Sequence, residues 1–111
     1  MEITVRVASP SDLTCLHRLQ VRASLANAGD RDYLLTNLDV IQVNRQILES
    51  GRTFVAQCEL KRGDCQVLGF AELEAPVASE VELEGIFVEP SWWRRGVGAA
   101  LARHCQCFAR Q

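Results

Sequence analysis

The feature that constrains the fold of this chain most is the segment 81–110, in which a strand leads through a proline turn into an amphipathic helix. Pro90 marks the turn, and the helix pattern begins at a Gly-x-Gly sequence, Gly96-Val97-Gly98. Glycines at a helix start let the first free backbone N–H groups approach a ligand closely. These donors and the positive end of the helix dipole favour an anion. The segment therefore predicts an anion-binding site between strand and helix.

Two arginines, Arg94 and Arg95, stand just before this helix and add charge-assisted donors for a phosphate or pyrophosphate. Two common phosphate-binding motifs do not fit. A P-loop needs a Gly-Lys-Ser/Thr sequence, which is absent. The dinucleotide fingerprint needs a third glycine where Leu101 stands, and an early βαβ unit.

The first third of the chain predicts a strand followed by a helix. Alternation over residues 3–7 predicts the strand, and Ser9 is expected to cap the helix, with Pro10 in its first turn. Asp12 occupies the partner position of a capping-box pattern. We expect this helix to break at residues 29–30.

The middle of the chain predicts a second helix and then a hairpin. Asp39 is the expected cap of a helix that ends near Gly51. Residues 53–58 and 66–73 read as antiparallel strands joined by a Lys-Arg-Gly-Asp turn, and Gly69 is expected to mark a bulge or a close backbone approach. The order strand, helix, helix, hairpin, strand, helix indicates an α/β (α+β) fold.

The last predicted strand is expected to alternate strictly, because successive side chains point to opposite faces. One face then carries Val81, Leu83 and Phe87, and the other carries Glu82, Glu84, Ile86 and Val88.

Composition limits the classes of function. A chain of 111 residues with 48% apolar and 23% charged residues suits a single domain, residues 1–111, with its own core. A net charge of −2 argues against a broad nucleic-acid or membrane surface. No apolar run approaches the roughly 18 residues of a membrane span. We expect a cytoplasmic protein.

Five cysteines, an odd number without a framework spacing, indicate reduced thiols. They are Cys15, Cys58, Cys65, Cys105 and Cys107. No C-x-x-C occurs, and the spacing of the last pair directs its two side chains differently on a helix. We therefore expect small buried hydrophobic residues and no metal site.

The last quarter of the chain resembles the signature of the GNAT superfamily of acetyl-CoA-dependent N-acetyltransferases. The matching residues are Val88-Glu89-Pro90 and Arg95-Gly96-Val97-Gly98-Ala99. Residues 67–71 look like the usual third strand of that family, and the order of elements agrees. The resemblance implies a mixed, mostly antiparallel sheet of about four strands, with helices ordered as predicted above.

The resemblance also implies a cofactor site for acetyl-CoA. The family's pyrophosphate loop corresponds to Arg94, Arg95, Gly96, Val97, Gly98 and Ala99. The pantetheine arm would bind the main chain of Phe87 and Val88. The implied reaction transfers the acetyl group to a primary amine of a small molecule or peptide, by direct attack.

Direct attack needs a neutral amine and therefore a general base. In the family this is often a glutamate on the fourth strand, and Glu82 and Glu84 occupy that strand here. The alternative interpretation of this pair is two solvated strand residues.

The sequence departs from the signature at Trp93, where the family usually has Gln or Arg. A pyrophosphate donor is lost there, and Arg94 or Arg95 would have to compensate. Trp92 is expected to pack beside the loop. A protein interface formed by both tryptophans is the alternative.

The chain stops at Gln111, where the resemblance places the end of the third helix. We therefore expect a C-terminally truncated domain that lacks the family's fifth strand, fourth helix and last two strands. The strand at residues 81–88 would then have an open edge, which favours pairing with a second copy. The alternative function is a catalytically incomplete CoA-binding or protein-interaction module, completed by dimerisation.

Overall fold

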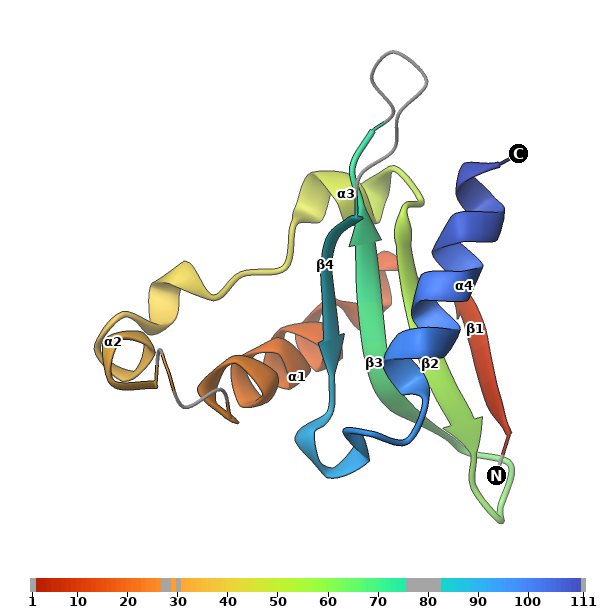
Figure 1. Ribbon diagram of the computed structural model, residues 1–111, viewed down its shortest axis with the longest axis horizontal. Helices are drawn as coiled ribbons and strands as arrows, with labels where there is room; N and C mark the ends of the chain where they lie inside the picture. The colour runs from red at the N-terminus through yellow and green to blue at the C-terminus, as the bar shows by residue number, and fades with distance from the viewer. Residues whose placement is uncertain (1, 27–28, 30, 76–82, 111) are drawn as a thin grey trace.

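The computed structural model describes residues 2–26, 29, 31–75 and 83–110 (Figure 1). The strands are β1 (Ile3–Val7), β2 (Thr53–Glu59), β3 (Cys65–Leu73) and β4 (Leu83–Val88). The helices are α1 (Leu13–Ala26), α2 (Arg31–Thr36), α3 (Arg45–Glu49) and α4 (Val97–Ala109). Short 3₁₀ turns are η1 (Pro10–Asp12), η2 (Leu38–Val40) and η3 (Pro90–Trp92).

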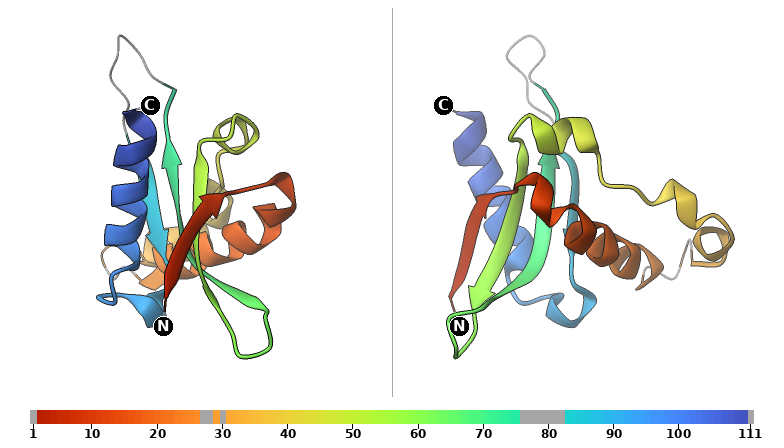
Figure 2. Two further views of the ribbon diagram at one scale, coloured as in Figure 1. Left: turned by 90° about the vertical axis from the view of Figure 1, so that its right-hand side faces the viewer. Right: turned by 180° about the vertical axis from the view of Figure 1, so that it is seen from behind.

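The strands form one antiparallel sheet in the order β1-β2-β3-β4. Helix α4 covers one face of the sheet, and α1 and α3 lie on the other (Figure 2). The α/β class predicted from the order of elements is confirmed. Because β4 is at the end of the strand order, it runs along one edge of the sheet with α1 and α4 on either side.

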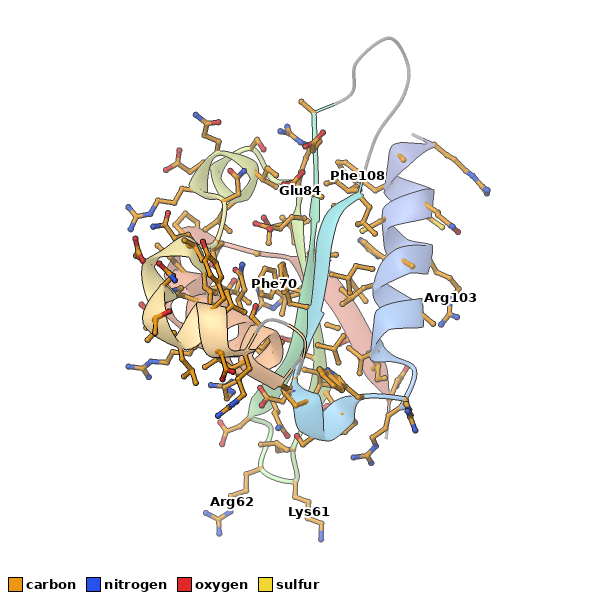
Figure 3. All side chains as sticks on the ribbon, turned by 60° about the vertical axis from the view of Figure 1, so that its left-hand side comes forward. Lys61, Arg62, Phe70, Glu84, Arg103 and Phe108 are labelled. Carbon is orange, nitrogen blue, oxygen red and sulfur yellow. The ribbon has the colours of Figure 1, made fainter. Side chains whose placement is uncertain are left out.

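The core has one layer on each face of the sheet. On the α4 side, Phe54 is fully buried and its ring lies 5.0 Å from that of Phe108, edge to face. On the α1 side, Phe70 is fully buried and stacks on Phe87 at 5.1 Å. Figure 3 shows Phe70 and Phe108 on opposite sides of the sheet. Alternation of side chains along the strands produces these two layers, and the register shift beside Gly69 places Leu68 in the α4 layer and Phe70 in the α1 layer.

The predicted start of the second helix, at Asp39, is wrong. The cap of α3 is Asn44, whose side chain accepts a hydrogen bond from the Ile47 N–H at 3.1 Å. Asp39 lies instead in η2, and α2 was not predicted as a helix. An Asn or Asp cap is effective only where its oxygen reaches a free N–H, and of Asp39 and Asn44 it is Asn44 that does so.

The predicted helix start at Ser9 is confirmed, although the first turn is the 3₁₀ turn η1. The Asp12 carboxylate accepts a hydrogen bond from the Ser9 N–H at 2.8 Å and forms an ion pair with Arg6 at 2.9 Å. Helix α1 ends at Ala26, and of the predicted break only Gly29 is among the described residues.

The prediction for Gly69 is confirmed. A Cβ atom at this position would lie 2.7 Å from the carbonyl oxygen of Phe87, so β3 and β4 are in close backbone contact there. The register of β2 on β3 also shifts between Ala56 and Gln57, next to Gly69.

The cysteine prediction is correct for two of the five positions. Cys58 and Cys105 are buried, whereas Cys15, Cys65 and Cys107 are exposed, and all five are free thiols. Across the described ranges, no group of three or more potential metal ligands occurs. None of the helices in those ranges is long and apolar enough to cross a membrane.

Candidate active site

The junction between β4 and α4 has a left-handed backbone at two positions. Gly96 caps α4 with a φ of 89°, and Arg94 has a φ of 64°. Nothing lies within 4 Å of a Cβ atom built on Gly96, so the backbone angle, and not a steric contact, requires the glycine. The first helical hydrogen bond joins the Ala100 N–H to the Gly96 carbonyl. The N–H groups of α4 before Ala100 therefore have no partner within the helix.

A cavity of about 980 Å³ lies against this junction, and we call it the loop cavity. Its walls also include Ala23 and Ser24 of α1 and Leu34 of α2. The predicted cofactor residues that line it are Phe87, Val88, Arg94, Gly96, Val97, Gly98 and Ala99. The structure thus brings these seven residues together around one space.

Arg95, the remaining predicted cofactor residue, does not line the loop cavity. Its guanidinium carbon lies 4.1 Å from the centre of the Trp92 ring, in a cation–π arrangement. Trp92 thus packs beside the loop, as expected, and holds the Arg95 guanidinium against a residue of the cavity wall.

Trp93 connects the loop to the end of β4 by a hydrogen bond. Its indole N–H donates a hydrogen bond to the Val88 carbonyl oxygen at 2.8 Å, while 44% of the residue stays exposed. A second contact stabilises the turn. The Glu89 carboxylate accepts hydrogen bonds from Arg22 of α1, and the shortest of them is 2.7 Å long. These two contacts position the loop relative to β4 and α1, and neither was predicted from the sequence.

The register of β4 decides which main-chain groups reach its outer edge. The Glu89 N–H donates to the Leu68 carbonyl on β3, and in an antiparallel pair every second residue points the same way. Phe87 therefore directs its main-chain groups toward β3. Ile86 and Val88 direct theirs toward the outer edge, where Trp93 already occupies the Val88 carbonyl.

A second cavity, of about 910 Å³, lies on the α1 side of the sheet, and we call it the carboxylate cavity. The side chains in its wall that carry polar or aromatic chemistry include His17, Gln20, Arg45, Glu72, Glu84 and Phe87. Phe87 belongs to both cavities. The two spaces therefore meet at one side chain of β4.

Glu72 of β3 is the buried carboxylate of this second cavity. It is only 3% exposed, and its Oε2 accepts a hydrogen bond from the Asn44 N–H at 3.0 Å. Burial raises the pKa of Glu72 above its ordinary value of 4.5, and the Asn44 hydrogen bond lowers it in part. Glu72 was not predicted as a site residue. The sequence feature that marks Glu72 is its charge, because it stands in an otherwise apolar stretch of strand that is fully buried.

Glu84, a predicted catalytic residue, lines the carboxylate cavity but is exposed. The prediction that it shares a face with Ile86 and Val88 is wrong, because the β3–β4 register shifts at this point and leaves Glu84 as an extra residue. A hydrogen bond with Glu84 is the largest cause that raises the pKa of nearby Glu74. Figure 3 shows Glu84 on β4. Glu82, the other predicted catalytic residue, lies outside the described residues.

Comparison with protein-family models matches residues 16–111 to the model described as the acetyltransferase (GNAT) family. A search of curated proteins finds no match.

Several solved structures share the fold. PaiA N-acetyltransferase from Thermoplasma acidophilum, in complex with coenzyme A, has a TM-score of 0.76 at 17% identity, over 99% of this chain and 73% of that one. Rv2747 from Mycobacterium tuberculosis, also in complex with coenzyme A, has a TM-score of 0.65 at 20% identity, over 96% and 57%. AAC(6')-Iy, bound to the bisubstrate analogue CoA-S-monomethyl-acetylneamine, has a TM-score of 0.58 at 25% identity, over 99% and 73%.

Proposed function

We propose, from the premise that this chain belongs to the acetyltransferase (GNAT) family, that it binds acetyl-CoA in the loop cavity and transfers the acetyl group to a primary amine. The observation that carries the proposal is the loop cavity itself, which joins the start of α4 to the outer edge of β4. A small molecule or a peptide is the proposed acceptor, and the cytoplasm is the proposed compartment of the reaction.

The loop cavity fits a pyrophosphate in chemistry and in shape. The N–H groups of Val97, Gly98 and Ala99 precede the first helical hydrogen bond and lie at the positive end of a 13-residue helix. Arg94 lines the same space, and Arg95 is held beside it by Trp92. We assign the pyrophosphate to these groups.

The outer edge of β4 suits the pantetheine arm. The main-chain groups of Ile86 and the N–H of Val88 point outward there and suit an extended amide-bearing chain. The main chain of Phe87 faces β3, so this residue contributes only its ring to the loop cavity. The contact expected from the main chain of Phe87 and Val88 is therefore proposed for Ile86 and Val88.

Acetyl-CoA supplies an activated acetyl thioester, and the protein must supply a group that removes a proton from the amine. Glu84 faces the carboxylate cavity and is retained as one candidate, together with Glu82. The ring of Phe87 separates that cavity from the loop cavity, so the thioester and the amine would meet beside it.

Isothermal titration with acetyl-CoA, with a CoA-release assay over a panel of amines, tests the proposal. In Gly98→Asp a carboxylate enters the loop cavity, and we expect acetyl-CoA affinity to fall by at least tenfold because like charges repel. Gln106→Asp, on the exposed side of α4, is the matched control and should bind as the parent does. Equal affinity of the two variants would contradict the assignment of the pyrophosphate.

A second candidate is a CoA-binding or interaction module without turnover of its own. It is favoured by one observation: across the part of the chain that the structure describes, no strand pairs with the outer edge of β4. Binding of acetyl-CoA without CoA release from any amine would favour this candidate, and release would exclude it.

A further inference from the structure

Gln20 of α1 carries a buried polar group without a partner. The residue is only 8% exposed, yet its Oε1 atom has no hydrogen-bond donor within the described ranges. It lies in the wall of the carboxylate cavity. A buried carbonyl oxygen is normally satisfied, so its isolation here points to a donor supplied by a ligand.

Glu72 presents a second acceptor to the same cavity. Asn44 occupies its Oε2, and no other hydrogen bond to this carboxylate occurs among the described residues. Its direct neighbour on β4 is Gly85, which has no side chain to cover it. A Cβ atom at Gly85 would lie 3.0 Å from the ring of Phe87. Because Gly85 has no side chain, the space above the carboxylate is filled by that ring and by the cavity.

No cation forms an ion pair with Glu72 among the described residues. The ion pairs found in the described ranges are Arg6–Asp12 and Arg22–Glu89, and neither involves this carboxylate. The other titratable side chains in the wall are His17, Arg45 and Glu84, from α1, α3 and β4. A buried carboxylate normally requires a paired charge.

We propose that the carboxylate cavity is the acceptor subsite, in which Glu72 and Gln20 bind the ammonium group of a cationic primary amine and Glu72 is the general base. The inference rests on the proposed acetyl transfer and assigns the proton acceptor to Glu72 in place of Glu82 or Glu84. A primary ammonium has three donors, two of which can be given to the Gln20 oxygen and the unoccupied Glu72 oxygen. A neutral alcohol has no charge to offset that of the carboxylate.

The ammonium gives one proton to the Glu72 carboxylate and becomes a neutral amine. Its nitrogen lone pair attacks the thioester carbonyl carbon, the C–N bond forms and the C–S bond breaks. The CoA thiolate leaves and takes the second proton from nitrogen, which yields the amide and CoA thiol. Glu72 then returns its proton to solvent through the open cavity.

Binding of a probe tests the subsite independently of turnover. Butylammonium and its neutral analogue butan-1-ol are titrated into the isotopically labelled protein by NMR, with the Gln20 side-chain amide and the Gly85 N–H as reporters. We expect both signals to shift with butylammonium and not with butan-1-ol. In Glu72→Gln the shifts should be lost, while Glu49→Gln, an exposed carboxylate on α3, should keep them. Retained binding in Glu72→Gln would overturn the proposal.

Kinetics test the role of Glu72 as base. A general base contributes about 10²–10⁴-fold, so Glu72→Gln should lower kcat/KM for the amine at least about 100-fold and remove the rise of rate with pH. The Kd for acetyl-CoA should not change. Gln20→Leu should raise the amine KM and leave the pH profile intact. A Glu72→Gln enzyme with parental kcat/KM would overturn the assignment, whereas failure of the parent to bind acetyl-CoA would count against the proposed function alone.

Discussion

At the scale of single residues, the carboxylate of Glu72 is a group whose burial opposes its ionisation. A raised pKa in the folded state means that the contribution of Glu72 to stability is fully present below its ordinary pKa of 4.5. This contribution is lost as the pH rises through the raised folded value, because the charged form is then confined in the core. A buried carboxylate of this kind lowers the stability of the fold at neutral pH.

We therefore predict that Glu72→Gln is more stable than the parent near neutral pH and that this advantage vanishes below the ordinary pKa of 4.5. The glutamine oxygen can still accept the Asn44 N–H, so the local fold is kept. Urea denaturation across this pH range measures the difference in free energy of unfolding. Glu49→Gln serves as the exposed control and should show no such pH dependence. A variant less stable than the parent at neutral pH would contradict the prediction.

At the scale of elements, the close contact of β3 and β4 depends on Gly69. A Cβ there would lie 2.7 Å from the Phe87 carbonyl and 3.2 Å from a Val97 methyl, so β4 and the start of α4 would both have to move. The position couples the sheet edge to the helix that borders the loop cavity.

We expect Gly69→Ala to destabilise the fold by about 1–3 kcal/mol, as overpacking of a core does. Gly98→Ala is the matched control, because its Cβ would meet only a Val88 methyl at 4.0 Å. That variant should be neutral, or more stable by about 0.5–1 kcal/mol from helix propensity. Thermal unfolding of both variants checks the pair, and equal stability would contradict the steric argument.

The same elements show what the sequence can predict. The strands of the hairpin, the close approach at Gly69 and the start of the first helix follow local rules of alternation, glycine use and capping. The orientation of Glu84 does not, because a register shift between two strands is set by their pairing. The hydrogen bond to Glu72 could not be predicted either, since its donor, Asn44, is distant in sequence.

At the scale of the whole molecule, the sheet of the described residues ends at β4, and the chain spans 57–73% of the similar structures named above. An exposed strand edge is a surface for pairing with another chain. The outward main-chain groups of Ile86 and Val88 are proposed to serve the pantetheine, so ligand and partner strand would compete for them.

We predict a concentration-dependent homodimer through the β4 edge that acetyl-CoA shifts toward the monomer. Sedimentation velocity over a range of protein concentrations, with and without acetyl-CoA, measures both effects. Ile86→Pro removes an outward N–H and should weaken the dimer, because proline has no donor for a paired strand. A strict monomer at all concentrations would exclude this arrangement.

The placement of the aromatic residues has one more consequence. Both tryptophans of the chain, Trp92 and Trp93, line the loop cavity. The single tyrosine, Tyr33, lies on α2 and is exposed. Indole emission of the unmodified protein therefore originates entirely beside the proposed cofactor, with one ring under a guanidinium and the other hydrogen bonded to the strand end. The protein carries its own optical reporter of that cavity, and no label has to be introduced.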